Sequence, residues 1–286
     1  MESTTNTLKV PGATLYYEVR GAGPVLLLIC GGIYDAAGYA GLANQLADRY
    51  TVVTYDRRGN SRSPLDGPPE RQSIEVHGDD AHRILTAVGV TGNESADVFG
   101  NSSGAVIGLE LAARNPEQVR TLVAHEPPVF SLLPDSDHWR SVIRQVEDAC
   151  RTGGPGAAME AFSTGMEMGR GSQPEPAQDQ APEQAAEPDA ETLAMIGRMG
   201  KNMDFFIAYE VPPFAQFTPD LEGLKACRVV LAAGDASVGE APHRAAFAVA
   251  ERLGTQPELF PGDHGGFGTQ SEAFAVRLRE VLSWLG

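Results

Sequence analysis

The sequence predicts an α/β protein built on a doubly wound, mainly parallel β-sheet. Short apolar runs such as Val25–Cys30 alternate with segments of helical periodicity, both before residue 126 and after residue 220. A continuous apolar run of this length is typical of a strand that is buried on both faces of a parallel sheet. Repetition of such strand–helix–strand units gives a layered α/β architecture.

The first half of the chain predicts a β-hairpin followed by alternating helices and strands. Residues 8–10 and 15–19 read as the two hairpin strands, joined across Pro11-Gly12. The elements expected after it are strands at 25–30, 51–55, 98–100 and 119–124, separated by helices around residues 39–46, 74–88 and 105–115.

The same alternation returns near the end of the chain. Residues 228–233 and 257–260 read as strands, with a helix at 242–253 between them and a final helix from about 271 to 285. Residues 1–126 and 220–286 are therefore expected to form one core domain.

Residues 127–219 interrupt this pattern and read as a helical insertion. Apolar positions at helical spacing, among them Trp139 and Val146, mark its helices. Its residues 171–191 are Pro-, Gln-, Ala- and acid-rich without a single Lys or Arg, so a mobile, solvated loop is expected there. The rest of the insertion is rich in Met and aromatic residues, which favours a deformable apolar pocket.

Composition narrows the function classes. The 286 residues carry a formal net charge of −16, which argues against nucleic acid or an anionic membrane as a partner. The three cysteines are too scattered for a disulfide framework or a zinc site. No apolar run could span a bilayer and no secretory signal is visible at Met1, so a soluble, cytoplasmic protein is expected. The sequence does not indicate an oligomeric state.

The motif Gly100-Asn101-Ser102-Ser103-Gly104 carries the chemistry. It follows an apolar strand and precedes a helix, which is the context of a G-x-S-x-G nucleophile elbow. Glycines on both sides allow a sharp bend that exposes the Ser102 hydroxyl beside a helix N-terminus. Ser102 is thus the expected nucleophile.

Four motifs occur in a recognisable order: Gly31-Gly32, the stretch 56–63 (Asp-Arg-Arg-Gly-Asn-Ser-Arg-Ser), the Ser102 elbow and the stretch 261–266 around His264. With them, nearly the whole chain resembles an α/β-hydrolase that has a helical cap, here 127–219, after its sixth strand. The resemblance implies a catalytic triad and neither a cofactor nor a metal. It also implies a structural role for the stretch 56–63.

The resemblance places the catalytic base at His264, in a glycine-rich loop after the last strand. It places the oxyanion hole at two backbone N–H groups, that of Ser103 and one from the Gly31-Gly32-Ile33 turn. Many relatives have His-Gly where this chain has Cys30-Gly31; aligned on that pattern, Gly32 donates, with Ile33 as the alternative.

The third member of the triad departs from the commonest pattern. The family's acid usually follows strand seven as Gly-x-x-Asp, but this turn reads Gly-Asp-Ala-Ser and ends in Ser237. Asp235 lies two residues early. The alternative is Glu126, at the end of strand six. This position is similar to that of the acid in haloalkane dehalogenases and some lipases, which follows strand six. Either carboxylate could fix the His264 tautomer, and we lean slightly towards Glu126.

The expected function is a serine hydrolase that cleaves a carboxylic ester, lactone or thioester of a hydrophobic small molecule, with water as second substrate. Two alternatives remain open. A lyase or cyclase on the same scaffold would use Ser102 and His264 as an acid–base pair without an acyl intermediate. A ligand-binding receptor with a slow triad is the third reading, which no sequence feature favours.

Overall fold

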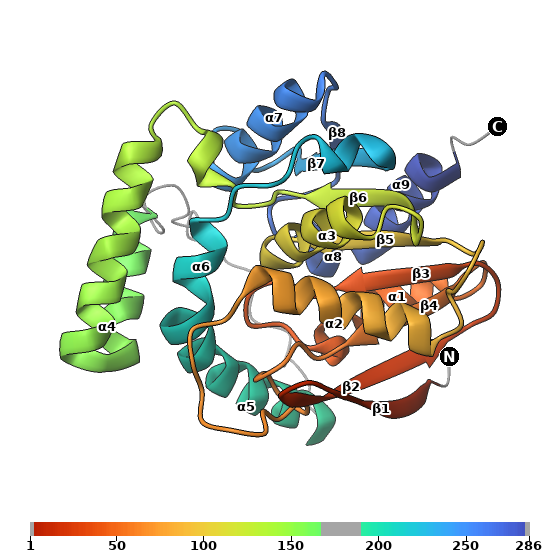
Figure 1. Cartoon of the computed structure of the whole chain (residues 1–286), viewed down its shortest axis with the longest axis horizontal. Coiled ribbons are helices and arrows are strands. Elements are labelled where there is room, and N and C mark those ends of the chain that lie inside the picture. The colour runs from red at the N-terminus through yellow and green to blue at the C-terminus, as the bar shows by residue number, and fades with distance from the viewer. Residues whose placement is uncertain (1–2, 167–189, 284–286) are drawn as a thin grey trace, which may run out of the picture.

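The computed structural model describes residues 3–166 and 190–283, and in them it shows one eight-stranded sheet with helices on both faces (Figure 1). The strand order is β1-β2-β4-β3-β5-β6-β7-β8. Pairing is antiparallel for β1–β2 and β2–β4 and parallel for all the other neighbours. The strands are β1 Thr4–Val10, β2 Ala13–Arg20, β3 Val25–Ile29, β4 Thr51–Tyr55, β5 Ala96–Asn101, β6 Val119–His125, β7 Arg228–Gly234 and β8 Glu258–Phe260.

Two apolar layers cover the sheet. On one face, side chains of helices α2 Ile74–Ala87, α3 Ser103–Arg114 and α7 Ala241–Leu253 form a buried cluster with the strands. On the other face the cluster is formed with α1 Ala40–Leu46, the short α8 Gly266–Thr269 and α9 Ser271–Ser283. The predicted fold class is therefore confirmed, and the hairpin turns at Gly12, whose φ of 80° suits glycine.

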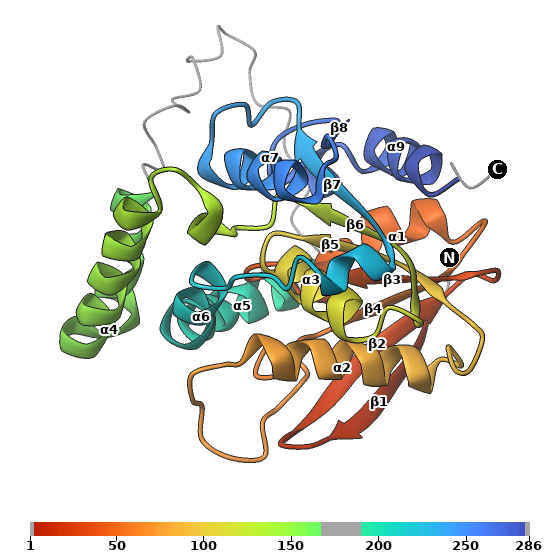
Figure 2. The same ribbon diagram turned by 45° about the horizontal axis from the view of Figure 1, so that its top comes forward.

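The segment between β6 and β7 is helical where the structure describes it. It contains α4 Ser136–Gly165, α5 Ala190–Phe205, a π-helix Phe206–Glu210 and α6 Val211–Ala215. In Figures 1 and 2, α4 lies at the far left with α6 next to it, and α5 lies nearer the centre. A small core of its own joins α4 to the π-helix and α6 through Ile143, Val146, Ala158, Ile207 and Val211. We call these elements the cap. Most of the stretch 171–191, expected to be a mobile loop, lies outside the described residues.

One polar side chain of α2 is buried under the cap. His77 is completely buried where the cap meets the core. Its ring packs edge-on against Phe214 of the cap, 5.4 Å between centroids. Helical periodicity identifies the face of a helix that meets the sheet, whereas His77 is covered by a segment more than a hundred positions away in the sequence.

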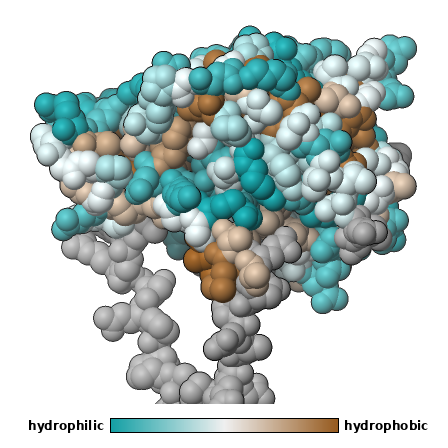
Figure 3. Space-filling model, turned by 90° about the horizontal axis from the view of Figure 1, so that it is seen from below, coloured by the Kyte–Doolittle hydropathy of each residue, from teal (hydrophilic) through white to brown (hydrophobic). Residues whose placement is uncertain are grey.

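The described helices include none that is both long enough and apolar enough to cross a membrane. Figure 3 shows a largely hydrophilic face with a few small hydrophobic areas.

Candidate active site

The nucleophile elbow lies between β5 and α3. Ser102 has φ 54° and ψ −125°, a conformation that is strained for any residue with a β-carbon. The flanking glycines make the turn possible, because a β-carbon on Gly100 would lie 2.4 Å from the Gly104 carbonyl oxygen and one on Gly104 would lie 2.1 Å from that of Ile29. Ser102 also donates its N–H to the His125 carbonyl at 2.9 Å, which ties the elbow to β6.

Glu126 contacts His264. The Nδ1 atom of His264 lies 2.6 Å from Glu126 Oε2. Glu126 is the residue directly after β6 and has a positive φ of 48°, so the strand end turns sharply and aims its side chain under the imidazole. The Glu126 side chain is fully buried, while that of His264 is 35% exposed.

The other carboxylate oxygen of Glu126 is held from β7. Oε1 accepts the Gly234 N–H at 2.9 Å and the hydroxyl of Ser237. Burial raises the pKa of Glu126, but the hydrogen bond and charge of His264, with help from Ser237, outweigh it and lower that pKa to about 2. The carboxylate is therefore ionised at neutral pH and accepts a proton-bearing Nδ1, which leaves Nε2 of His264 free to act as a base.

Asp235, the rival acid, lies elsewhere. Its Oδ1 accepts the Gly262 N–H at 2.8 Å, and its own N–H donates to the Phe260 carbonyl at 2.9 Å. Asp235 thus fastens the loop that carries His264 to the end of β7 and β8. The structure brings Glu126, and not Asp235, to the imidazole.

Asn101 is a further contact to the His264 loop that sequence reasoning missed. Its Nδ2 donates to the His264 carbonyl and to His125 Nδ1, both at 3.0 Å. Burial lowers the pKa of His125 to about 3 against the opposing charge of Glu126, so this ring is neutral and accepts the hydrogen bond. The one signal in the sequence was the position of Asn101, immediately before the expected nucleophile.

The Gly31-Gly32-Ile33 turn lies against the elbow. A β-carbon on Gly31 would come within 2.9 Å of Ser102 Cβ, and the Gly32 N–H donates to Ser103 Oγ at 2.8 Å. The Ser103 N–H belongs to the first residue of α3, where backbone donors lack partners within the helix. Cys30 is fully buried beside this turn, and burial raises the pKa of its thiol well above the usual range.

The stretch 56–63 braces the same region. Asp56 Oδ1 accepts the Ala36 N–H at 2.9 Å, and Oδ2 accepts the Arg62 N–H at 3.0 Å. Arg58 forms a two-point ion pair with Asp80 of α2 at 2.6 Å. In the described residues no group of three or more His, Cys, Asp or Glu side chains could hold a metal ion.

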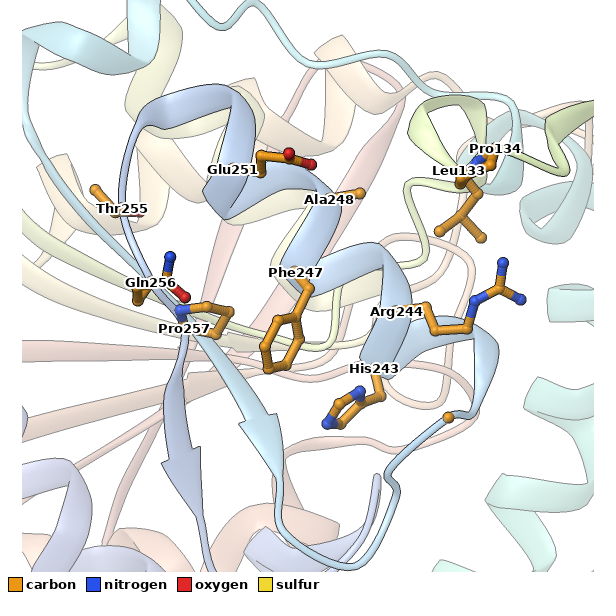
Figure 4. A pocket seen from close by; sticks show the side chains of 11 residues that line it. Leu133, Pro134, His243, Arg244, Phe247, Ala248, Glu251, Thr255, Gln256 and Pro257 are labelled. Carbon is orange, nitrogen blue, oxygen red and sulfur yellow. The ribbon is translucent and has the colours of Figure 1, made fainter.

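A surface cavity of about 520 Å³ lies away from Ser102, over α7 (Figure 4). Leu133 and Pro134 form one wall, and His243, Phe247 and residues 255–257 form the others. None of Ser102, Glu126 and His264 lines it.

The fold is that of the α/β hydrolases. A family model described as the alpha/beta hydrolase fold matches residues 24–147. The chain is also 37% identical to the uncharacterized hydrolase YraK of Bacillus subtilis, over 99% of this chain and 97% of the relative. The chain belongs to the α/β-hydrolase fold family.

Solved structures share the fold at lower identity. An esterase from Thermogutta terrifontis has a TM-score of 0.69 and 20% identity, with 99% of this chain and 98% of that chain covered. The enol-lactonase of Burkholderia xenovorans LB400 has a TM-score of 0.68 and 17% identity, with 97% of this chain and 100% of that chain covered.

Proposed function

We propose that this protein is a serine hydrolase that cleaves a carboxylic ester, lactone or thioester of a hydrophobic small molecule. The observation that carries the proposal is the 2.6 Å contact between His264 Nδ1 and the buried Glu126 carboxylate. Glu126 follows the carboxyl end of β6, and Ser102, in its strained turn, follows the carboxyl end of the neighbouring strand β5. This is the arrangement that activates a serine hydroxyl, which is a poor nucleophile without an adjacent base.

In the proposed reaction Ser102 Oγ attacks the carbonyl carbon while His264 Nε2 accepts its proton. Glu126 stabilises the imidazolium and does not itself take up the proton. His264 then protonates the leaving alcohol or thiol, and the acyl group remains on Ser102. Water, activated by the same imidazole, attacks the acyl-serine and releases the acid.

For the oxyanion hole we propose the N–H groups of Ser103 and Ile33. The Gly32 N–H, preferred from the sequence alignment, donates to Ser103 Oγ at 2.8 Å and is therefore engaged. Ile33 is the next residue of the turn, and its N–H is the remaining donor of the pair considered. Two backbone donors aimed at the developing charge are the usual means of stabilising such an intermediate.

The comparisons support the reaction class. Proteins of the same fold include one named as an esterase and one named as an enol-lactonase, both of which act on carboxylic esters in the broad sense. The Met and aromatic residues of the cap, which favour a deformable apolar pocket, support a hydrophobic substrate.

Replacement of Ser102 tests the proposal. Ser102→Ala should abolish hydrolysis of p-nitrophenyl esters and covalent labelling by a fluorophosphonate, because the nucleophile is absent. Ser141→Ala, on α4 of the cap, is the matched control and should keep both. Full activity of Ser102→Ala would overturn the proposal. Substrate conversion by the wild type without an acyl-serine in the mass spectrum would instead favour lyase or cyclase chemistry.

A further inference from the structure

We propose that the cap sets the rate of the chemical step by holding residues 30–33, which we call the oxyanion turn. Arg57 and the cap residues Glu210 and Asn202 are the positioning residues. The inference rests on the proposed function and adds to it a role for three side chains that touch neither Ser102 nor His264. It starts from how the carbonyl groups of residues 30–33 are bound.

The carbonyl groups of this turn all have donors. Arg57 donates from Nη1 to the Cys30 carbonyl at 2.5 Å and from Nη2 to the Gly32 carbonyl at 2.7 Å. The Gly31 carbonyl accepts the Tyr34 N–H at 3.1 Å. The Ile33 carbonyl accepts Nδ2 of Asn202, on cap helix α5, at 2.9 Å. The turn thus cannot rotate a peptide plane without losing a hydrogen bond.

The Arg57 contact decides where the Ile33 N–H points. The Gly32 carbonyl and the Ile33 N–H belong to the same planar trans peptide, in which the two groups point in opposite directions. Arg57 holds the carbonyl at 2.7 Å, so the Ile33 N–H points away from Arg57. Loss of the Arg57 contact would free this peptide to flip, as the φ of 53° at Gly32 leaves a glycine hinge on one side of it.

Glu210 of the cap holds Arg57 in place. Arg57 Nη2 lies 2.7 Å from Glu210 Oε2, and both side chains are fully buried. Glu210 Oε1 accepts Nδ2 of Asn60 at 2.9 Å, which fixes the carboxylate in turn. A buried guanidinium without its carboxylate is strongly unfavourable, so the position of Arg57 depends on the cap π-helix that supplies Glu210.

Asn202 makes an independent second connection. Besides its bond to the Ile33 carbonyl, it accepts the Ser61 N–H at 2.8 Å through Oδ1. Its side chain is almost fully buried, and Ser61 has a positive φ of 48°. Helix α5 therefore binds the Ile33 carbonyl directly, and the π-helix acts on the neighbouring Gly32 carbonyl through Arg57.

The test distinguishes two effects of the contacts between cap and core: positioning of the oxyanion turn, and attachment of the cap without an effect on the turn. Arg57→Lys keeps the positive charge but loses the planar guanidinium, which donates to two carbonyls and a carboxylate. Glu210→Gln removes the negative charge with little change in the shape of the side chain. Asn202→Ala cuts the second connection and leaves the buried ion pair intact. The control is Arg71→Ala, because exposed Arg71 also joins core to cap, through Glu147 at 2.5 Å, without touching the turn.

Each variant is assayed on p-nitrophenyl butyrate, with active sites counted by end-point fluorophosphonate labelling, and with an aryl trifluoromethyl ketone that forms a tetrahedral adduct. We expect kcat to fall by about 10-fold or more for Arg57→Lys and Glu210→Gln, since complete loss of an oxyanion donor costs about 10²–10³. The affinity for the ketone should fall by the same factor, while KM changes little. Arg71→Ala should match the wild type.

The inference would be overturned if Arg57→Lys and Glu210→Gln kept the kcat and the ketone affinity of the wild type per active site and had only a lower melting temperature. Should those two variants fail to fold, Asn202→Ala decides the question on the same two measurements, with a fall of kcat and ketone affinity expected. A wild type that the fluorophosphonate does not label would count against the proposed function itself, so the two failures are distinguishable.

Discussion

At the scale of single residues, Glu126 is the carboxylate that contacts the His264 imidazole. Glu126 touches His264 and is bound by Gly234 and Ser237, whereas Asp235 binds the Gly262 N–H. The sequence left the two carboxylates open because it does not show which side chain crosses from one strand end to its neighbour. The sequence did show that a serine, Ser237, stands where the family usually has its acid. In the structure the Ser237 hydroxyl donates to the Glu126 carboxylate at the end of the adjacent strand.

Glu126→Gln should lower kcat by about 10⁴, the scale seen when the aspartate of a triad is neutralised, because the amide favours the wrong tautomer of the imidazole. The measurement is kcat on a p-nitrophenyl ester. Asp235→Asn is the matched control and should retain most of the activity. A larger loss in Asp235→Asn than in Glu126→Gln would reverse the assignment.

Ser237→Ala removes one donor from a buried carboxylate. Hydrogen bonds to charged groups contribute about 1.5–3 kcal/mol, so a fall of that size in the free energy of unfolding is expected from urea denaturation. The activity should fall much less than in Glu126→Gln, because His264 and the Gly234 N–H still hold the carboxylate. Unchanged stability would show that the Ser237 hydrogen bond contributes nothing.

At the scale of elements, the strands and their order along the chain could be predicted from the sequence. The segments that pack against each element in space could not. Apolar runs located β3, β4 and β6 to within a residue or two, because a strand buried on both faces has a local signature. Local patterns carry no record of which element covers a buried polar side chain. Glu210 and Asn202 therefore could not be assigned to the oxyanion turn, since each meets its partner across more than a hundred residues of sequence.

Gly104→Ala tests how closely α3 packs against β3. The added β-carbon would lie 2.1 Å from the Ile29 carbonyl oxygen, so backbone must move and the variant should lose several kcal/mol of stability or fail to fold. Gly197→Ala is the matched control, because a β-carbon there meets nothing within 4 Å and alanine favours the interior of α5. That variant should gain up to about 1 kcal/mol in thermal or chemical denaturation.

At the scale of the whole molecule, stability in acid should depend on Glu126. Its pKa is lowered to about 2 from the usual 4.5, so the folded state binds this proton less readily than the unfolded chain does. The stabilisation is therefore complete above pH 4.5 and is lost as the pH falls towards 2.

The measurement is the free energy of unfolding of the wild type and of Glu126→Gln across this interval. The difference between the two proteins should be largest above pH 4.5 and should shrink as the pH approaches 2, because a protonated Glu126 resembles glutamine in charge. A difference that stays constant with pH would contradict the lowered pKa.

The pairing of Asn101 with His125 in the β5–β6 ladder has a consequence for how this site can vary. Ser102 and Glu126 are the next residues after the two strands, so the proposed nucleophile and the proposed acid leave the sheet at one level and lie within a span of 25 residues. The Gly234 N–H at the end of β7 and the Ser237 hydroxyl in the turn after it both bind Glu126. An exchange of the segment between β6 and β7 would therefore keep Ser102 and Glu126 together, but it would replace Glu210 and Asn202, which contact Arg57 and the residues Ser61 and Ile33.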